Sequence, residues 1–197
     1  TVFVASVDGK LYAVYTTDET EQGRTDVDGN PAPKAGDKKW VFEMLPLPHI
    51  WPGPADPALS PDGATVCIGS ANNYFYAIDA SGGTEKWKRD TGGEIKSSPV
   101  FSLDGASVFI GNDTSLYDLS MSTGAINPGS PYVMPWTSPI KSLIMNSNKD
   151  ALFVITEDAR IYARSLSMWN SNKNYHTFNS NQWGSGSINL GGAGVLG

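Results

Sequence analysis

The sequence contains 197 residues, enough for one domain with a substantial buried core, and 40% of them are apolar while only 17% are charged. The net charge of −6, with no run of Lys and Arg, disfavours nucleic acid as a partner, because phosphate binding needs a basic surface. No apolar stretch approaches the roughly 20 residues that a membrane-spanning helix requires.

The composition and one repeated pattern both indicate an all-β protein. The 21 Gly, 13 Pro, 6 Trp, 8 Tyr and 7 Phe are typical of short aromatic-rich strands separated by frequent turns. Four segments each contain a strand-like run, a short turn and a second strand. They are residues 2–14, 66–78, 108–117 and 152–163. Asp8-Gly9 and Asn72-Asn73 supply residues that tolerate the positive φ angles of two-residue hairpin turns.

The spacing of these hairpins predicts the fold class. The last three begin 42 and 44 residues apart, and a multi-strand repeat of about 40–45 residues is the period of a β-propeller blade. A further strand is predicted before the hairpins, because residues 57–63 and 99–105 match each other and each ends in an Asp-Gly turn. An outer strand is predicted to begin near Thr84. We therefore expect an all-β propeller of four-stranded antiparallel blades, about four blades' worth, in a single domain over residues 1–197.

The longer interval between the first two hairpins predicts an inserted polar loop at about residues 17–39. Within it, oxygen-bearing side chains stand at alternate positions, as in Ca²⁺-binding loops, and a further carboxylate stands at the twelfth position. These candidate ligands are Asp26, Asp28, Asn30 and Asp37. Pro31 stands where an EF-hand loop needs Gly, and no helices are predicted beside it. A solvated polar loop is therefore the favoured interpretation, and a Ca²⁺ site is the alternative.

Residues 77–87 read Ala-Ile-Asp-Ala-Ser-Gly-Gly-Thr-Glu-Lys-Trp. This segment closely resembles the tryptophan-docking motif of the pyrroloquinoline-quinone (PQQ) type propeller family, which has Ala-x-Asp, two residues, Thr-Gly, three residues and Trp. Only Gly82 departs from the family pattern. The matching positions are Ala77, Asp79, Gly83 and Trp87. The resemblance implies that the Trp wedges between adjacent blades and that the Asp and the turn residues fix the connection.

Other copies of this motif are weaker. Ala13 leads to Trp40 only across the inserted loop, and Gly124 keeps the turn although Pro128 stands where Trp is expected. Trp40 and Trp87 are expected to pack between sheets rather than to stack on a substrate. The sequence starts on a second-strand pattern and residues 187–196 resemble a first strand, which suits either ring closure or a piece of a larger ring. We favour part of a larger propeller, because related propellers commonly have about seven or eight blades.

Residues that carry chemistry are sparse. PQQ dehydrogenases hold their cofactor with neighbouring cysteines, a catalytic Asp and Ca²⁺ ligands, whereas Cys67 is the only cysteine here and lies in an apolar run, as a buried inert thiol would. His49 and His176 have no nucleophile motif around them. Residues 112–114 form a formal N-glycosylation acceptor. An enzyme is therefore the less favoured interpretation, and no cofactor is expected apart from the Ca²⁺ alternative.

The function expected from these features is a non-catalytic propeller that binds protein partners through its faces or its inserted loop, as a scaffold or assembly component. Two alternatives remain: a fragment of a PQQ-dependent quinoprotein dehydrogenase, and a structural subunit of a large extracytoplasmic complex. Neither nucleic-acid binding nor a membrane span is expected. Because most of the family that the motif resembles works outside the cytoplasm, a periplasmic, luminal or secreted location is expected.

Overall fold

The computed structural model describes residues 1–17, 29, 34–44, 55–113, 115–133, 138–148, 150–158 and 161–166. Within these residues the chain forms strands and turns and contains no α-helix. Consequently no helix in the described ranges is long and apolar enough to cross a membrane.

Fourteen strands in the described residues form four antiparallel sheets, which follow one another along the chain. The first sheet contains β1 (Val2–Ala5), β2 (Lys10–Val14) and β3 (Lys38–Glu43). The second contains β4 (Ala58–Leu59), β5 (Thr65–Gly69), β6 (Tyr74–Asp79) and β7 (Glu85–Asp90). The third contains β8 (Val100–Phe101), β9 (Ser107–Gly111), β10 (Ser115–Ser120) and β11 (Tyr132–Val133). The fourth contains β12 (Ile140–Met145), β13 (Ala151–Thr156) and β14 (Ile161–Ser165).

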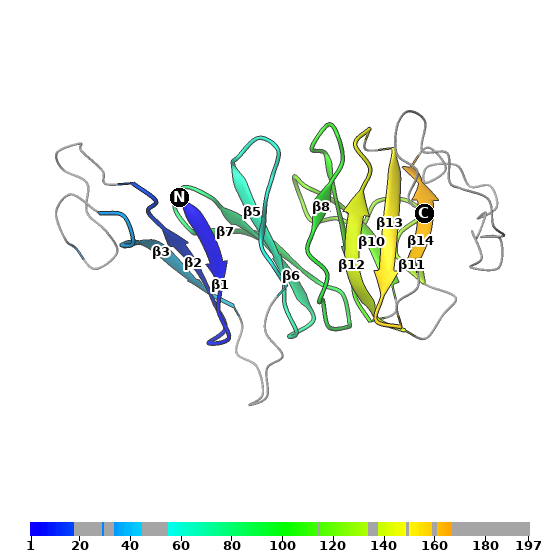
Figure 1. Cartoon of the computed structure of the whole chain (residues 1–197), viewed down its shortest axis with the longest axis horizontal. Coiled ribbons are helices and arrows are strands. Elements are labelled where there is room, and N and C mark those ends of the chain that lie inside the picture. The colour runs from blue at the N-terminus through cyan, green and yellow to red at the C-terminus, as the bar shows by residue number, and fades with distance from the viewer. Residues whose placement is uncertain are drawn as a thin grey trace, which may run out of the picture.

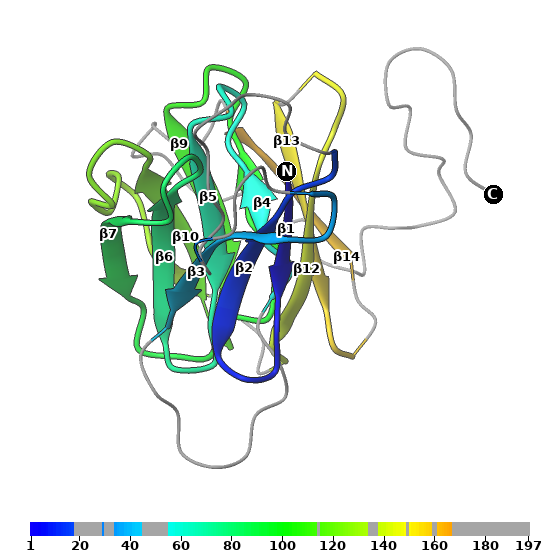
Figure 2. The same ribbon diagram turned by 90° about the vertical axis from the view of Figure 1, so that its left-hand side faces the viewer.

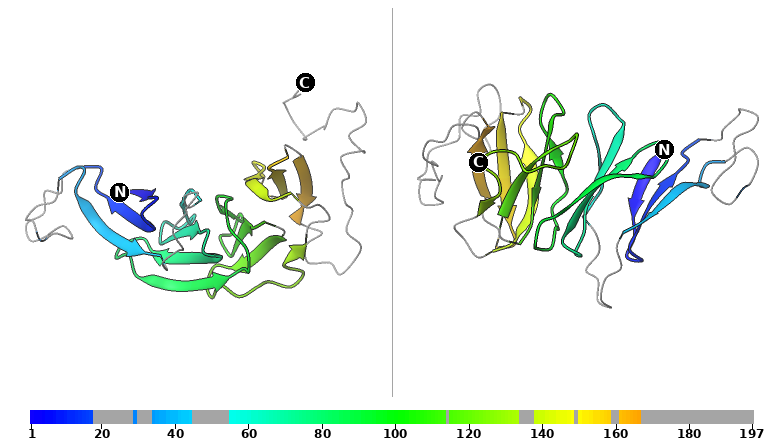
Figure 3. Two further views of the ribbon diagram at one scale, coloured as in Figure 1. Left: turned by 90° about the horizontal axis from the view of Figure 1, so that it is seen from below. Right: turned by 180° about the vertical axis from the view of Figure 1, so that it is seen from behind.

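The four sheets stand side by side in chain order and together follow an arc (Figure 3, left). The first sheet lies at one end of the arc and the fourth sheet at the other (Figure 1). Within each sheet, strands that are consecutive in sequence are neighbours, so the chain runs up and down from the concave side of the arc to the convex side. Figure 2, seen from the end of the first sheet, shows the sheets stacked one behind another. This is the arrangement of propeller blades, and it confirms the predicted fold class.

The predicted hairpin turns occur where their residues allow positive φ angles. Gly9 connects β1 to β2 with a φ of 81°, and Asn73 connects β5 to β6 with a φ of 71°. The turns set equivalent registers in the two sheets, since Val2 is paired with Val14 and Val66 with Ile78. Each strand pair therefore presents alternate residues to the two faces of its sheet.

The hydrophobic core lies between the sheets rather than within one of them. Three buried clusters join the first sheet to the second, the second to the third and the third to the fourth. Strand β5 contributes to two of them, because Val66 and Ile68 face the first sheet while Cys67 faces the third. Burial on both faces explains why this strand reads as a continuous apolar run rather than an alternating one.

The inserted loop ends earlier than the predicted residue 39. Lys38 already pairs with Val14 as the first residue of β3, so the strand register sets the boundary before it. The backbone N–H of Tyr15 donates to the carbonyl of Asp37 at 3.0 Å, and the N–H of Gly36 donates to the carbonyl of Tyr15 at 2.9 Å. These two hydrogen bonds hold the two ends of the insertion together, beside the first residues of β3.

Candidate functional site

The segment that resembles the docking motif forms the turn between β6 and β7. Asp79 Oδ1 accepts hydrogen bonds from the Ser81 hydroxyl at 2.5 Å, the Gly82 N–H at 2.8 Å and the Ser81 N–H at 2.9 Å. These donors, the Ser81 hydroxyl foremost, lower the pKa of Asp79. The carboxylate thus holds the turn in one conformation, and its Oδ1 atom is occupied by the fold.

Gly83 completes this turn, and its Cα lies close to a tryptophan of the preceding sheet. Its φ is 72°, and a Cβ atom at this position would lie 2.6 Å from Cδ2 of Trp40 in β3. Gly124, in the equivalent turn of the third sheet, has a φ of 67°, and a Cβ there would lie 2.5 Å from Cε3 of Trp87. Each indole ring therefore packs closely against a glycine of the next sheet, a position that only glycine fills without displacement.

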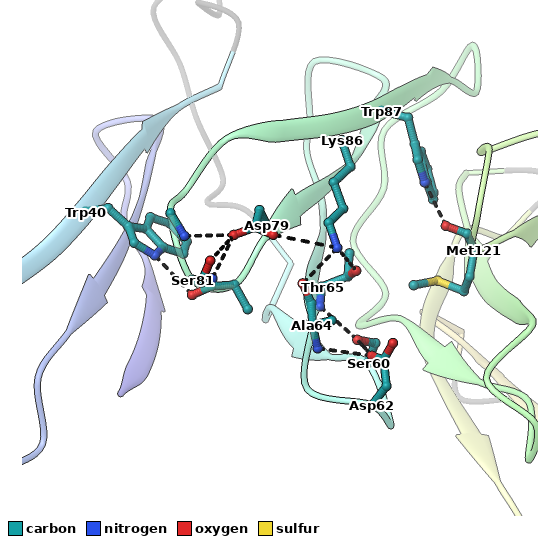
Figure 4. A network of polar contacts seen from close by, with 12 residues as sticks. Trp40, Ser60, Asp62, Ala64, Thr65, Asp79, Ser81, Lys86, Trp87 and Met121 are labelled. Carbon is teal, nitrogen blue, oxygen red and sulfur yellow. Dashed lines mark hydrogen bonds and ion pairs between the residues drawn. The ribbon is translucent and has the colours of Figure 1, made fainter.

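Each indole N–H group also donates to the turn that contains the glycine its ring contacts. Trp40 Nε1 donates to the carbonyl of Ala80 at 3.2 Å, and Trp87 Nε1 donates to the carbonyl of Met121 at 2.8 Å. In Figure 4 the ring of Trp87 points toward Met121, and the ring of Trp40 approaches the turn that contains Asp79. The two tryptophans thus link the outer strand of one sheet to the turn of the next at both of the first two contacts between sheets.

Lys86 ties the same region together within the second sheet. Its Nζ donates to the carbonyl of Ala64 at 2.9 Å and to the Thr65 hydroxyl at 2.8 Å, and it lies 3.8 Å from an Asp79 carboxylate oxygen (Figure 4). Ala64 belongs to the turn before β5, in which the Asp62 carboxylate accepts a hydrogen bond from the Ser60 hydroxyl. The polar groups of this network hydrogen-bond to one another, so the network has a structural role: it connects the turns of the second sheet.

A second kind of contact between sheets repeats where β5 and β9 end. The backbone N–H of Ile95 donates to the carbonyl of Ser70 at 3.2 Å, and that of Ile140 donates to the carbonyl of Asn112 at 3.4 Å. Both isoleucine side chains pack on glycines of the preceding sheet, Gly69 and Gly111, where an added Cβ would meet them at 2.2 Å and 2.4 Å. The contact between the second and third sheets is therefore fixed by Ile95 as well as by Trp87, and the contact between the third and fourth sheets is fixed by Ile140.

The third sheet lacks the tryptophan of the first two, because Pro128 stands at the motif position where Trp is expected. Asp118 occupies the place that Ala77 has in the second sheet, and its side chain is buried. Asn127 Nδ2 donates to Asp118 Oδ1 at 2.7 Å and to the Ser107 hydroxyl at 3.0 Å. Burial raises the pKa of Asp118, and the hydrogen bonds from Asn127 and Ser107 oppose this rise only in part.

One of the four candidate Ca²⁺ ligands lies within the described residues. Asp26, Asp28 and Asn30 lie outside the described residues, whereas Asp37 is described and its Oδ2 accepts the backbone N–H of Lys34 at 2.7 Å. Across the described ranges, no three His, Cys, Asp or Glu side chains gather as a metal site would require. The Ca²⁺ site stays a prediction, which calorimetric titration of the full chain with Ca²⁺ would test.

The remaining sequence candidates fall into two groups. His49 and His176 lie outside the described residues. Cys67 is fully buried, with its Sγ 4.0 Å from the sulfur of Met121, and burial raises the pKa of its thiol to about 12. Asn112 is buried too, and its amide donates to the carbonyl of Thr91 at 2.9 Å, so this side chain is not available to carry a glycan in the folded protein.

One ionic cluster has no signal in the sequence. Lys96 Nζ lies 3.3 Å from a Glu94 carboxylate oxygen and 3.2 Å from one of Glu157, which follows β13. Burial opposes the charge on Lys96, but the pairs with Glu157 and Glu94 prevail and raise its pKa. All three side chains are partly exposed, so the cluster adds a modest, salt-sensitive contact between the third and fourth sheets.

No family model matches the chain, and no curated protein matches it. Solved structures do resemble it. BamB from Moraxella catarrhalis has 18% sequence identity and a TM-score of 0.55, over 84% of this chain and 43% of its own. A chain of the mitotic checkpoint complex has 15% identity and a TM-score of 0.63, over 83% and 44%. BBS1N, crystallised with ARL6DN, has 14% identity and a TM-score of 0.56, over 83% and 42%.

At these identities the likeness establishes the fold and nothing further. The chain has a β-propeller fold, with antiparallel sheets as blades. It spans less than half the length of each of these three proteins.

Proposed function

We propose that this chain is a non-catalytic β-propeller whose blades act as a scaffold for protein partners. The proposal is supported by the structures it resembles, because two of them are complexes by their titles: the mitotic checkpoint complex and BBS1N with ARL6DN. It is also supported by the docking-like segment, whose Asp79 is engaged in holding its own turn and whose Trp87, like Trp40 of the first sheet, is engaged in holding neighbouring blades together. We further propose that the repeat is of the PQQ type, on the resemblance of residues 77–87.

The observation that carries the proposal is two exposed leucines, one beside each of two touching turns on adjacent blades, which we call the partner patch. Leu59 ends β4 and is 46% exposed, while Leu103 lies in the turn between β8 and β9 and is 71% exposed. The two turns touch, since a Cβ at Gly105 would lie 3.8 Å from Cγ of Pro61. Binding residues are commonly found on loops that a rigid scaffold positions, and exposed apolar side chains at two such neighbouring turns suit a protein partner.

Site-specific photo-crosslinking tests this patch. A photoreactive amino acid at residue 103 is expected to give a discrete protein adduct in cells of the source organism. The adduct is expected to disappear when Leu59→Asp is added. The matched control is the same amino acid at residue 7, because Val7 is 76% exposed but lies in the turn between β1 and β2. No adduct from residue 103, or the same adducts from both positions, would count against a partner site on these turns.

The location of the protein belongs to the same proposal. We place it outside the cytoplasm, because residues 77–87 resemble a family that works mostly there. Fractionation of source cells, followed by antibody detection, is expected to find the chain outside the cytoplasmic fraction. Recovery with a cytoplasmic marker would contradict this placement and leave the partner patch to be tested separately.

A further inference from the structure

The three contacts between neighbouring sheets share an apolar centre but differ at the outer strands. Each contact buries one hydrophobic cluster, so apolar packing joins all three pairs of sheets. At the first two contacts the outer strand adds a docked tryptophan, Trp40 or Trp87, which is paired within its own sheet with a buried alanine. The third sheet has other residues at the same register positions.

Ser130 occupies the register position of Trp87. Trp87 is paired with Ala77 across β7 and β6, and the register of β10 with β11 places Asp118 opposite Ser130 in the same way. The Ser130 hydroxyl accepts the backbone N–H of Asp118 at 2.8 Å, so it bonds within its own sheet. The indole N–H of Trp87, by contrast, donates to the following sheet. At this position the third sheet therefore has no side chain that ties its outer strand to the fourth sheet.

A carboxyl is buried where the second sheet has an alanine. Asp118 lies two residues from Leu116 along β10, so both point to the side of the third sheet that packs on the fourth. Ala77, its counterpart, is buried among the apolar side chains of the contact between the second and third sheets. Asp118 is 5% exposed and accepts a hydrogen bond from Asn127 at 2.7 Å. Burial of a carboxyl costs free energy that such a hydrogen bond restores only in part, whereas burial of an alanine does not.

The ionic link between the third and fourth sheets does not replace a docked tryptophan. Lys96 and Glu157 lie 3.2 Å apart with side chains that are partly exposed, so their pair adds little stability and is weakened by salt. At the contact between the second and third sheets, Arg89 Nε donates to the carbonyl of Gly124 at 2.7 Å, beside the ring of Trp87. The outer strand of the second sheet is thus held at two neighbouring positions.

We propose that the contact between the third and fourth sheets opens before the other two, because Asp118 and Ser130 stand where the other contacts have an alanine and a docked tryptophan. Opening separates the fourth sheet from the first three without unfolding either part, and it exposes the cluster that contains Phe109 and Leu152. Native proteins open in such local steps, and the least stabilised contact opens first. The inference is independent of the partner patch, which lies on turns of the second and third sheets.

Buried cysteines at comparable positions measure the opening of each contact. Val66, Val108 and Val154 are each at most 2% exposed, and each belongs to a different one of the three clusters. Each is changed to cysteine, one at a time, in the full chain carrying Cys67→Ala. The rate of labelling by a disulfide reagent in buffer, divided by the rate in urea, gives the open fraction of each contact. The thiol at residue 154 is expected to react about tenfold faster than either of the others, which corresponds to about one net hydrogen bond.

Val66→Cys is the matched control for position in the arc. Its contact, like that of Val154, joins an end sheet to its neighbour (Figure 1). A general loosening of end sheets would make residues 66 and 154 react equally fast and would overturn the proposal. Equal rates at all three positions would overturn it too, because they would mean that the contacts open only when the whole chain unfolds.

Asp118→Asn tests the assigned cause. It removes the charge at nearly constant size, so at pH 7 it is expected to slow the labelling of residue 154 several-fold and to leave that of residue 108 unchanged. An unchanged rate at residue 154, or equal slowing at both residues, would overturn the role of Asp118 in this contact.

Hydrogen exchange of the wild-type chain supplies a measurement that needs no substitution. The N–H of Ile140 donates to the carbonyl of Asn112 in the third sheet, and the N–H of Ile95 donates to that of Ser70 in the second. Each amide therefore reports on one contact between sheets. The Ile140 amide is expected to exchange faster than the Ile95 amide, and equal rates or the reverse order would overturn the proposal.

Discussion

The indole ring of Trp87 lies so close to Gly124 of the next blade that a Cβ on residue 124 would come within 2.5 Å of its Cε3 atom. The same relationship joins Trp40 to Gly83, at 2.6 Å. A tryptophan on the outer strand and a left-handed glycine in the following turn therefore act as a pair, and the pair can be tested from either side.

Gly124→Ala is expected to destabilise the protein far more than an ordinary turn substitution. The left-handed conformation costs about 1–2 kcal/mol for alanine, and the clash with the indole adds about 1–3 kcal/mol of overpacking. Gly92→Ala is the control, because Gly92 has a φ of 69° but its Cβ would meet nothing within 4 Å. Urea denaturation should give a larger loss of unfolding free energy for residue 124. Equal losses would mean that the indole ring of Trp87 moves aside at little cost and that the contact with residue 124 is not tightly packed.

Trp87→Phe removes the other half of the contact. In the wild type the indole N–H donates to the carbonyl of Met121 at 2.8 Å. Phenylalanine has no such donor, and an unsatisfied, partly buried carbonyl costs about 1–3 kcal/mol. In combination with Gly124→Ala, the losses are expected to be less than additive, because the smaller ring leaves room for the new methyl group. A double-mutant cycle by urea denaturation measures this coupling; strict additivity would contradict direct contact.

The buried carboxyl of Asp118 is expected to make stability fall as pH rises. Burial raises its pKa in the folded state, so folding favours the protonated form. This contribution is complete below the unfolded-state value of about 4 and is lost as pH rises through the folded-state value. Asp118→Asn should therefore be more stable than the wild type at pH 7, and the difference should shrink toward pH 4 in urea denaturation.

Asp104→Asn is the control with the opposite sign. The Ser102 hydroxyl lowers the pKa of Asp104, so this carboxylate stabilises the fold above its unfolded-state value and loses that effect as pH falls. The variant should lose stability at pH 7 relative to the wild type. If Asp118→Asn behaved like Asp104→Asn, the raised pKa of Asp118 would be refuted.

Cys67 is expected to react with thiol reagents only when the protein unfolds. Its side chain is fully buried and the pKa of its thiol is about 12, so almost no thiolate exists at pH 8. Labelling with a disulfide reagent should be slow in buffer and fast in urea, with a rate that follows the unfolding transition. Fast labelling of the native protein would mean that the contact between the second and third blades opens readily.

The hairpins could be predicted from the sequence because their information is local. Asp8-Gly9 and Asn72-Asn73 specify tight turns within a few residues, and Gly9 and Asn73 adopt the expected positive φ angles. The blade period could be predicted for the same reason, since each repeat restates the turn residues at a similar spacing.

The partners across the blades could not be predicted, because they are set by packing between distant segments. Trp40 donates to Ala80, 40 residues away, and Lys96 pairs with Glu157, 61 residues away, with no spacing rule to connect them. The end of the insertion also could not be predicted from local sequence. Lys38 and Lys39 have the polar character of a loop, but Lys38 pairs with β2 and is the first residue of β3. Strand register, which is a property of two segments together, decided that boundary.

The way the insertion closes has a consequence for how this blade can vary. Tyr15 with Gly36 forms the same hydrogen bond as Asp79 with Gly83 and Ser120 with Gly124, although the segment between the first pair is many residues longer. The length of chain between these anchors is thus uncoupled from the alignment of β2 with β3. We therefore expect this position to tolerate longer or shorter segments, which would make it a suitable place to graft a recognition sequence.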